Sequence, residues 1–215
     1  MKKIEILKES IQKLNVNTIS VKDIEDIICQ FGLVHDKGCD YGEFKKYMVA
    51  QRVDLGVYQT PRQFAECIYD LLQLDINSYF EIGLFNGGSY LIMTEFLKLK
   101  NPNVKCIGVD ITDKYMLSEV KPLLDGFEMK TSDDFAGKQF DLVFIDGDHR
   151  YSGIKTDWDN VGKFAKYVII HDINQPTWPA VKKFWNEIKT DKKHKEYLYQ
   201  TENKNVHGIG LIFNE

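Results

Sequence analysis

The chain lacks the features that would place it in a membrane, in an oxidising compartment or on nucleic acid. None of its apolar runs approaches the roughly 20 residues that a membrane span needs. Its four cysteines form no C-x-x-C pair, so we expect reduced thiols rather than a disulfide framework or a zinc site. Its 28 basic residues stand against 32 acidic ones, for a net charge of −4, which offers no basic surface to nucleic acid or to an anionic membrane. We therefore predict a cytoplasmic protein with neither of those partners.

The G-x-G-x-x-G spacing of a dinucleotide site is also missing, which argues against a nicotinamide dehydrogenase. The stretch "EIGLFNGGS" instead carries Gly83, Gly87 and Gly88, which permit a tight turn and close backbone approach before a helix N-terminus that can receive an anion. Asp110 ends the next apolar run, where a carboxylate can bind both hydroxyls of a ribose. A nucleoside with a carboxylate tail fits both features. The alternative is a purely structural one, a tight turn followed by a helix-capping aspartate.

Apolar runs alternate with helical segments from residue 78 onward. The runs "SYFEIG", "VKCIGVD", "FDLVFID" and "YVIIHDI" are typical of buried strands, and their alternation with helices predicts an α/β fold with a parallel sheet covered on both faces. The chain closes with "KEYLYQT" and "GIGLIF", which suggest an antiparallel C-terminal hairpin. We expect two regions, an N-terminal helical cap over residues 1–57 and a Rossmann-like domain over residues 58–215.

The expected helices carry apolar side chains at helical spacing. In the first region, Ser20 is the expected N-cap of a helix with Asp23 three residues later. Thr60 and Pro61 open another helix at the cap and first-turn positions. Two later helices should bury a shared set of side chains, namely Ile154, Trp158, Val161, Phe164, Val181, Phe184, Trp185 and Ile188.

The motifs "EIGLFNGGS", "GVD", "FDLVFIDGDHRYSGIKTDW" and "VIIHDI" resemble, in order, those of class I S-adenosylmethionine-dependent methyltransferases. The most similar group is that of the small-molecule O-methyltransferases that includes macrocin O-methyltransferase and cephalosporin-hydroxylase-like proteins. The resemblance covers about residues 58–213, and I-D-G-D-H-x-Y is its most discriminating element. It implies a seven-stranded sheet whose last strand is antiparallel.

The resemblance also implies roles for individual residues around S-adenosylmethionine. Residues near the methionine part are expected in the glycine turn and its flanks, and Asp110 is expected on the ribose. Asp133 should lie near the adenine, although Asp134 could take its place. Asp146 would border the cofactor as well. The full cofactor set is Glu81, Gly83, Gly87, Gly88, Ser89, Asp110, Asp133 and Asp146.

Two aspartates and a histidine follow the expected strands "FDLVFID" and "YVIIHDI". By resemblance, Asp146 and Asp172 are ligands of a divalent cation such as Mg²⁺, and His149 is the general base. Carboxylates that end adjacent parallel strands can converge on one cation, which would lower the pKa of a bound hydroxyl. His171 stands where related metal-binding members carry a second acid, so it is either a third ligand or a packed residue. His35, His194 and His207 show no pattern of partners.

The sequence thus predicts an O-methyltransferase for a hydroxyl of a small-molecule or saccharide acceptor, and it leaves a homo-oligomer open. Two alternatives remain: a metal-independent methyltransferase, in which His149 and Asp172 orient the acceptor, and a cofactor-binding module without activity. The loop at residues 32–42, with Tyr41, and the loop "NQPTWPA", with Trp178, are candidates for lids over the acceptor. Core packing is the alternative for Trp178.

Overall fold

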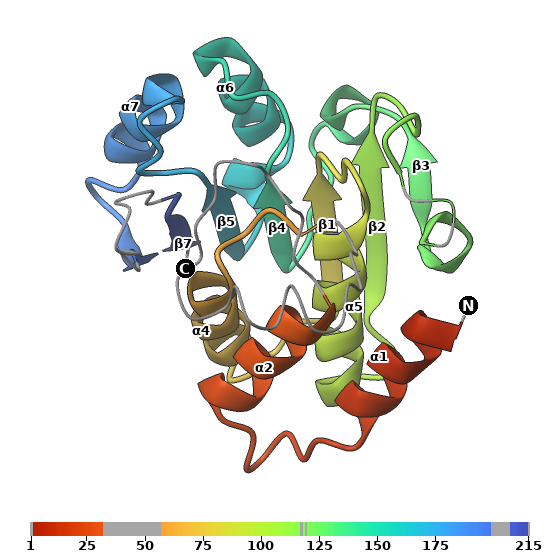
Figure 1. Cartoon of the computed structure of the whole chain (residues 1–215). Coiled ribbons are helices and arrows are strands. Elements are labelled where there is room, and N and C mark those ends of the chain that lie inside the picture. Colours follow the sequence, from red (N-terminus) through yellow and green to blue (C-terminus); the bar gives the residue numbers. More distant parts are fainter. Residues whose placement is uncertain (1, 32–56, 117, 119, 199–206, 215) are drawn as a thin grey trace.

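The computed structural model describes residues 2–31, 57–116, 118, 120–198 and 207–214. Within them a seven-stranded sheet has the order β3-β2-β1-β4-β5-β7-β6 (Figure 1). Strands β1 to β5 are parallel neighbours, whereas β7 runs antiparallel to both β5 and β6. The bounds are β1 Ser78–Ile82, β2 Lys105–Asp110, β3 Phe127–Met129, β4 Leu142–Ile145, β5 Tyr167–His171, β6 Lys193–Tyr197 and β7 Ile209–Phe213. The predicted α/β sheet with an antiparallel C-terminal hairpin is confirmed.

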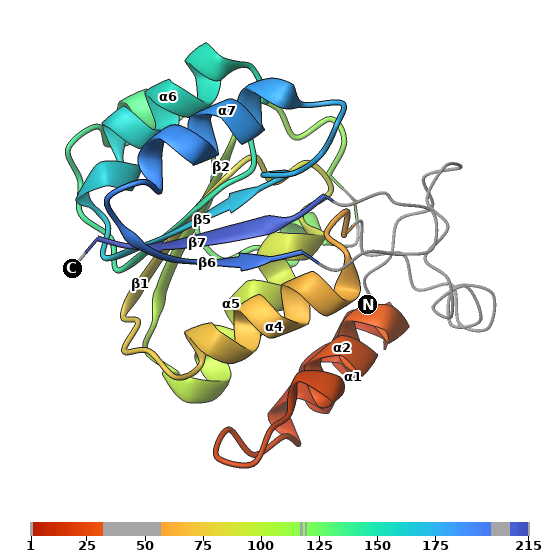
Figure 2. The same ribbon diagram turned by 90° about the vertical axis from the view of Figure 1, so that its left-hand side faces the viewer.

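Helices cover both faces of the sheet, as Figure 2 shows. Helices α1, α2, α4 and α5 lie on one side, and α6 and α7 lie on the other. Their bounds are α1 Lys2–Gln12, α2 Val21–Phe31, α4 Pro61–Leu71, α5 Gly88–Lys100, α6 Tyr151–Asn160 and α7 Pro179–Ile188. Short 3-10 turns connect them at η2 Lys121–Leu123, η3 Ser132–Phe135 and η4 Gly162–Phe164. The predicted loop at residues 32–42 lies outside the described residues.

The central strands are buried on both faces because their residues alternate between two hydrophobic cores. Tyr79 and Phe144 face the core under α4 and α5. Phe80 and Val143, their neighbours along the strands, face the core under α6 and α7. This two-sided burial explains why the strands appear in the sequence as continuous apolar runs.

The N-terminal helices pack onto the sheet through the first of these cores. The backbone N–H of Ser20 donates to Asp23 Oδ2 at 2.9 Å, and the N–H of Asp23 reaches Ser20 Oγ at 3.3 Å. This reciprocal pair is a capping box, as the sequence predicted. Ile24 and Ile28 of α2 are buried in the core that also holds Phe64 of α4.

The second core confirms most of the helical spacing and corrects one residue. Trp158, Phe184 and Trp185 are buried as expected. Phe164 is 41% exposed, because α6 ends at Asn160 and the chain continues as the turn η4, which breaks the helical phase. The prediction that Phe164 is a core residue was therefore wrong.

Two findings bear on the expected environment of the chain. No helix in the described part is long and apolar enough to cross a membrane. Cys29, Cys67 and Cys106 take part in no disulfide bond there, and Cys39 lies outside the described residues.

Candidate functional site

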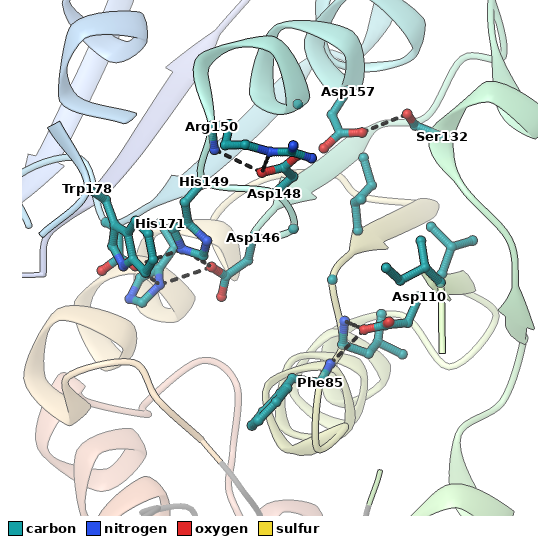
Figure 3. A pocket seen from close by; sticks show the side chains of 18 of the residues that line it. Phe85, Asp110, Ser132, Asp146, Asp148, His149, Arg150, Asp157, His171 and Trp178 are labelled. Atoms are coloured by element: carbon teal, nitrogen blue, oxygen red, sulfur yellow. Dashed lines mark hydrogen bonds and ion pairs between the residues drawn. The ribbon is translucent and has the colours of Figure 1, made fainter. Parts of the chain in front are cut away.

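A pocket of about 1060 Å³ opens at the carboxyl ends of the central strands (Figure 3). This is the edge at which ligands bind in open α/β sheets. One end of the pocket adjoins the glycine turn after β1 and the end of β2, and the other adjoins the residues that follow β4 and β5. The predicted site residues that line it are Gly83, Ser89, Asp110, Asp133, Asp146, His149, His171 and Asp172.

Gly83 allows the end of β1 to approach the end of β4. Its φ is +86°, and a Cβ atom there would lie 2.3 Å from the backbone oxygen of Asp146. Gly87 also has a positive φ, of +85°, and caps α5, where a Cβ would press on Val120 and Leu124. Gly87 and Gly88 do not line the pocket. Gly87 therefore shapes the turn that presents the N-terminus of α5, and the cofactor contacts expected of both glycines stay a prediction.

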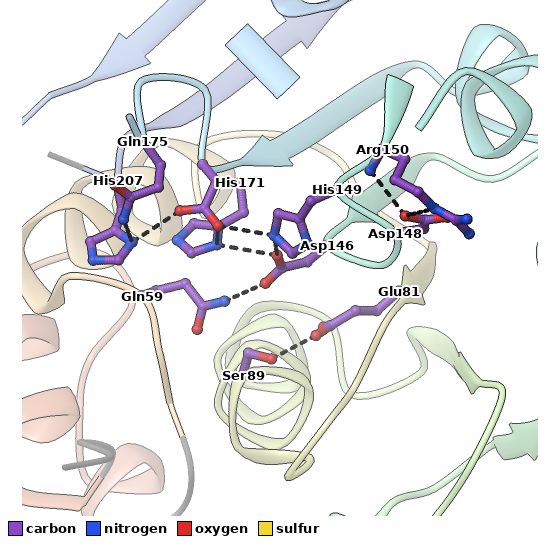
Figure 4. Close-up of polar contacts among 11 residues, drawn as sticks. Gln59, Glu81, Ser89, Asp146, Asp148, His149, Arg150, His171, Gln175 and His207 are labelled. Atoms are coloured by element: carbon purple, nitrogen blue, oxygen red, sulfur yellow. Dashed lines mark hydrogen bonds and ion pairs between the residues drawn. The ribbon is translucent and has the colours of Figure 1, made fainter. Parts of the chain in front are cut away.

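Glu81 lies beneath the pocket wall, not on it. Its side chain is fully buried and accepts hydrogen bonds from the hydroxyl of Tyr79 and, at 2.7 Å, from Ser89 Oγ (Figure 4). Burial raises the pKa of Glu81 to about 8, although these two hydrogen bonds oppose the rise. Ser89 itself reaches the pocket, so Glu81 supports that residue from below.

Asp110 holds the glycine turn in place. Its Oδ2 accepts the backbone N–H groups of Leu84 and Phe85, both at 2.9 Å, and its Oδ1 accepts that of Thr112 at 3.1 Å. Phe85 needs such support, since its φ of 47° is unusual for a residue other than glycine. A carboxylate has about four acceptor positions, so Asp110 keeps capacity for a ligand while fixing the turn.

The two neighbouring aspartates of "KTSDDF" point in different directions. Asp133 lines the pocket and accepts from Asn160 Nδ2 at 2.8 Å. Asp134 does not line it, and its Oδ2 accepts the backbone N–H of Thr131 at 3.2 Å in a capping box. Of the two residues, Asp133 is therefore the one positioned to meet a ligand.

A buried carboxylate lies beside Asp133 that the sequence did not single out. Asp157 of α6 accepts from Ser132 Oγ at 2.6 Å, and both residues line the pocket. Burial raises the pKa of Asp157 to about 6.

The other end of the pocket brings together Asp146, His149 and Asp172. Asp146 directly follows β4 and Asp172 directly follows β5, and β4 and β5 are adjacent in the sheet. His149 Nε2 lies 3.0 Å from Asp172 Oδ2 and 3.8 Å from Asp146 Oδ1. Asp172 adopts a φ of 60°, a conformation that costs energy and is often found at functional sites. The convergence that the sequence predicted is present.

Two further histidines complete this end of the pocket (Figure 4). His171 Nδ1 lies 3.1 Å from Asp146 Oδ1, and His207 Nδ1 lies 2.9 Å from Asp172 Oδ1. His207 directly precedes Gly208 and β7, so the hairpin delivers it to the site. The expectation that His207 has no partner pattern was wrong, because its partners belong to β5 and the following loop and only the sheet brings them together.

Gln59 also contacts this cluster, and the sequence analysis missed it. It is 2% exposed, and its Nε2 donates to Asp146 Oδ2 at 2.7 Å. It directly precedes the cap of α4, and no local motif connects it to a strand end far along the chain.

The charges of the cluster stabilise one another. Burial lowers the pKa of His149, but the hydrogen bond with Asp172 and the two carboxylate charges outweigh it, so the pKa is raised. The same balance raises the pKa of the buried His171, chiefly through the charges of Asp146 and Asp172. Burial would raise the pKa of Asp172, but the charge of His171 and the hydrogen bonds of His149 and His207 hold it far below its usual range.

Trp178 forms part of the wall beside His149. Its side chain is 42% exposed, and its ring centroid lies 4.7 Å from that of His149 at a tilt of 31°. The core-packing interpretation of Trp178 is therefore wrong, and the residue lines the pocket as a lid candidate would. The other candidate, Tyr41 and its loop, lies outside the described residues.

Comparison with known proteins agrees with this geometry. Residues 80–173 match the model of a family described as a methyltransferase domain. An uncharacterised protein of Acanthamoeba polyphaga mimivirus is 26% identical over 153 residues, which cover 59% of this chain and 67% of that protein.

Three solved structures have a similar fold. Cofactor-bound Rv0187 from MTB has a TM-score of 0.55 at 16% identity and covers 74% of this chain and 83% of its own. The O-methyltransferase of Bacillus cereus, in complex with SAH, has a TM-score of 0.53 at 13% identity, and the match covers 93% of this chain and 100% of that one. The O-methyltransferase TomG of Streptomyces achromogenes, in complex with SAM, has a TM-score of 0.51 at 16% identity, and the match covers 74% of this chain and 82% of that one. The match over residues 80–173 agrees with the methyltransferase resemblance of the sequence, and the solved structures confirm the fold.

Proposed function

We propose that the protein is an S-adenosylmethionine-dependent O-methyltransferase that acts on a hydroxyl of a small-molecule or saccharide acceptor. The contact that carries the proposal is that between His149 and Asp172, because it places an oriented base in the same pocket as the glycine turn and Asp110. The methyltransferase-domain match over residues 80–173 and the solved O-methyltransferases of the same fold support it.

The glycine-turn end fits a nucleoside with an amino-acid tail. Gly83 lines the pocket where the end of β1 approaches the end of β4, and Asp110 presents carboxylate oxygens at the end of β2. Asp133 offers a hydrogen-bond acceptor to the adenine base of the cofactor, and Ser89 lies at the N-terminus of α5. When bound, S-adenosylmethionine supplies an electrophilic methyl group on a positively charged sulfur.

His149 acts as the base in this proposal. It takes the proton of the acceptor hydroxyl while the oxygen forms its bond to the methyl carbon and the carbon–sulfur bond breaks. The products are a methyl ether, S-adenosylhomocysteine and a protonated imidazole, so charge and atoms balance. Asp172 holds the ring through the 3.0 Å contact and stabilises its charged form, as a carboxylate partner does for a catalytic histidine.

The position of Trp178 favours an acceptor that contains a ring. Its exposed aromatic face is suited to the apolar face of a sugar or to another flat ring, while the polar side chains of Gln175 and His207 line the same pocket. The acceptor would then sit between an apolar wall and hydrogen-bonding groups, with its hydroxyl toward His149.

A divalent cation is a separate part of the proposal. Asp146 and Asp172 would hold it, and each offers a ligand atom within 4.8 Å of the other. Their surroundings are rich in imidazole, which fits poorly with Mg²⁺, a cation that prefers oxygen ligands. No step of the mechanism above depends on a metal.

Isothermal titration calorimetry tests the cofactor, and a transfer assay tests the reaction. We expect binding of S-adenosylmethionine and S-adenosylhomocysteine and none of NAD, followed by methyl transfer to at least one member of a panel of sugars and phenols. Absence of heat with both sulfur nucleotides, on folded protein freed of carried-over ligand, would overturn the proposal. Full activity after exhaustive EDTA treatment would favour the metal-independent alternative. Binding without transfer to any panel member would favour the inactive module.

A further inference from the structure

The cluster at the end of β5 contains a second set of donor groups, distinct in its chemistry from a pair of carboxylates. His171, Asp172 and His207 each offer one ligand atom, and these atoms lie within 4.8 Å of one another. His171 and Asp172 are buried, and His207 is half-buried. Two imidazoles and one carboxylate form a donor set that binds first-row transition metals in many proteins.

The distance from Asp172 to each histidine is close to the distance between two ligands of a single cation. His207 Nδ1 lies 2.9 Å from Asp172 Oδ1, and His171 Nδ1 lies 3.6 Å from Asp172 Oδ2 and 3.1 Å from Asp146 Oδ1. Ligands at about 2.0–2.2 Å from a metal are separated by about 2.9–3.5 Å in tetrahedral or octahedral geometry. Small side-chain movements would therefore convert these contacts into coordination bonds.

The same ring shows which nitrogen of His171 would bind the cation. Nδ1 is the nitrogen that faces Asp146 and Asp172, so a bound cation would take the lone pair of Nδ1 and the ring proton would lie on Nε2. Nε2 is buried and has no hydrogen-bond partner among the described residues.

We propose that this cluster is a site for a first-row transition cation, bound by His171, Asp172 and His207, and that it discriminates against Mg²⁺. Asp146 lies close enough to His171 to supply a further oxygen. The selectivity follows from position 171, because imidazole binds Co²⁺, Zn²⁺ or Mn²⁺ better than it binds the hard Mg²⁺ ion.

The experiment uses the untagged full-length chain, stripped with EDTA and then dialysed. Titration with Co²⁺ is followed by its visible absorption, and melting temperatures are measured with Co²⁺, Zn²⁺, Mn²⁺ or Mg²⁺. We expect a stoichiometric Co²⁺ spectrum that Zn²⁺ displaces and that Mg²⁺ displaces only at an excess on the order of 100-fold. Equal displacement by Mg²⁺, or no Co²⁺ spectrum at all, would overturn the proposal.

Two variants and a matched control locate the site. His207→Gln should weaken Co²⁺ binding by at least about 10–100-fold, since even altered outer-shell partners of a metal cost that much. His171→Asp should lower Co²⁺ affinity and raise Mg²⁺ affinity, because it replaces an imidazole by an oxygen ligand. His194→Asp removes an exposed histidine on β6, outside the cluster, and should leave both affinities unchanged.

The outcome is separable from that of the proposed function. S-adenosylhomocysteine binding, measured by calorimetry on each variant, reports the cofactor end of the pocket and confirms that the variant is folded. If wild-type protein binds S-adenosylhomocysteine but shows no preference for Co²⁺ over Mg²⁺, the metal proposal fails and the proposed function stands. If it binds Co²⁺ selectively but binds neither sulfur nucleotide, the proposed function fails and the metal proposal stands. A Co²⁺ affinity that His207→Gln and His171→Asp leave unchanged would place any bound cation elsewhere.

Discussion

The two ends of the pocket are held together in different ways. At the glycine-turn end, Asp110 is fixed by backbone N–H groups of residues 84, 85 and 112. At the histidine end, side chains hold other side chains: Asp172 contacts His149 and His207, and Asp146 contacts Gln59. A frame built on backbone groups tolerates changes elsewhere in the chain. A network of charged side chains depends on each member, because losing one leaves a buried polar partner unpaired.

The histidine end should give the largest effect when one residue is removed. His149→Ala removes the proposed base and should lower turnover by about 10²–10⁴-fold, with affinity for S-adenosylhomocysteine retained. Initial rates with an acceptor found in the panel, together with calorimetry, measure both quantities. Turnover close to wild type across pH 6–9 would exclude His149 as the base.

Asp110 tests whether the glycine-turn end binds the cofactor or only supports the turn. Asp110→Ala should weaken S-adenosylhomocysteine binding by about 10–100-fold, since each hydrogen bond to a charged group contributes about 1.5–3 kcal/mol. Asp134→Ala is a suitable control, because Asp134 caps the turn η3 and does not line the pocket. Equal affinity of wild type and Asp110→Ala would show that the role of Asp110 is confined to the turn.

Gly83 lies where the glycine-turn end of the pocket meets the histidine end, so its substitution should destabilise the fold. Gly83→Ala places a Cβ 2.3 Å from the Asp146 backbone and should lower the free energy of unfolding by about 1–3 kcal/mol. Gly137→Ala separates the steric clash from the cost of the positive φ, because Gly137 has a similar φ of +78° but nothing within 4 Å of its Cβ position. Urea denaturation of both variants measures the difference. Equal losses would attribute the effect to backbone conformation alone.

The smallest expected effect is a pH dependence at Asp157. Its pKa of about 6 in the folded state lies above the ordinary value of 3.8, so between these pH values the folded chain keeps a proton that the unfolded chain has lost. Stability from this group therefore falls as pH rises from about 4 to 6, by at most about 1.4 kcal/mol per pH unit. Asp157→Asn should flatten that slope in denaturation measured from pH 4 to 7. An unchanged slope would show that the pKa of Asp157 is not raised.

Much of the fold was predictable because it depends on local patterns. Two-sided burial produces continuous apolar runs, which located β1, β2, β4 and β5, and the reciprocal contact of Ser20 and Asp23 marked the start of α2. Helical spacing failed at Phe164, where a 3-10 turn interrupts the phase that the pattern assumed. The exposure of Trp178 could not be foreseen either, because an aromatic residue in a loop is as compatible with a core as with a pocket.

The sequence by itself determined that carboxylates and a histidine would gather at one edge of the sheet. Asp110, Asp146 and Asp172 each end or follow a parallel strand, and parallel strands share the edge at which they end. Only the tertiary structure decided which further side chains join them. Gln59 and His207 lie 87 and 35 residues from their partners Asp146 and Asp172, and no local periodicity specifies such contacts. They arise because the segment before α4 and the antiparallel strand β7 are packed against the same strand ends.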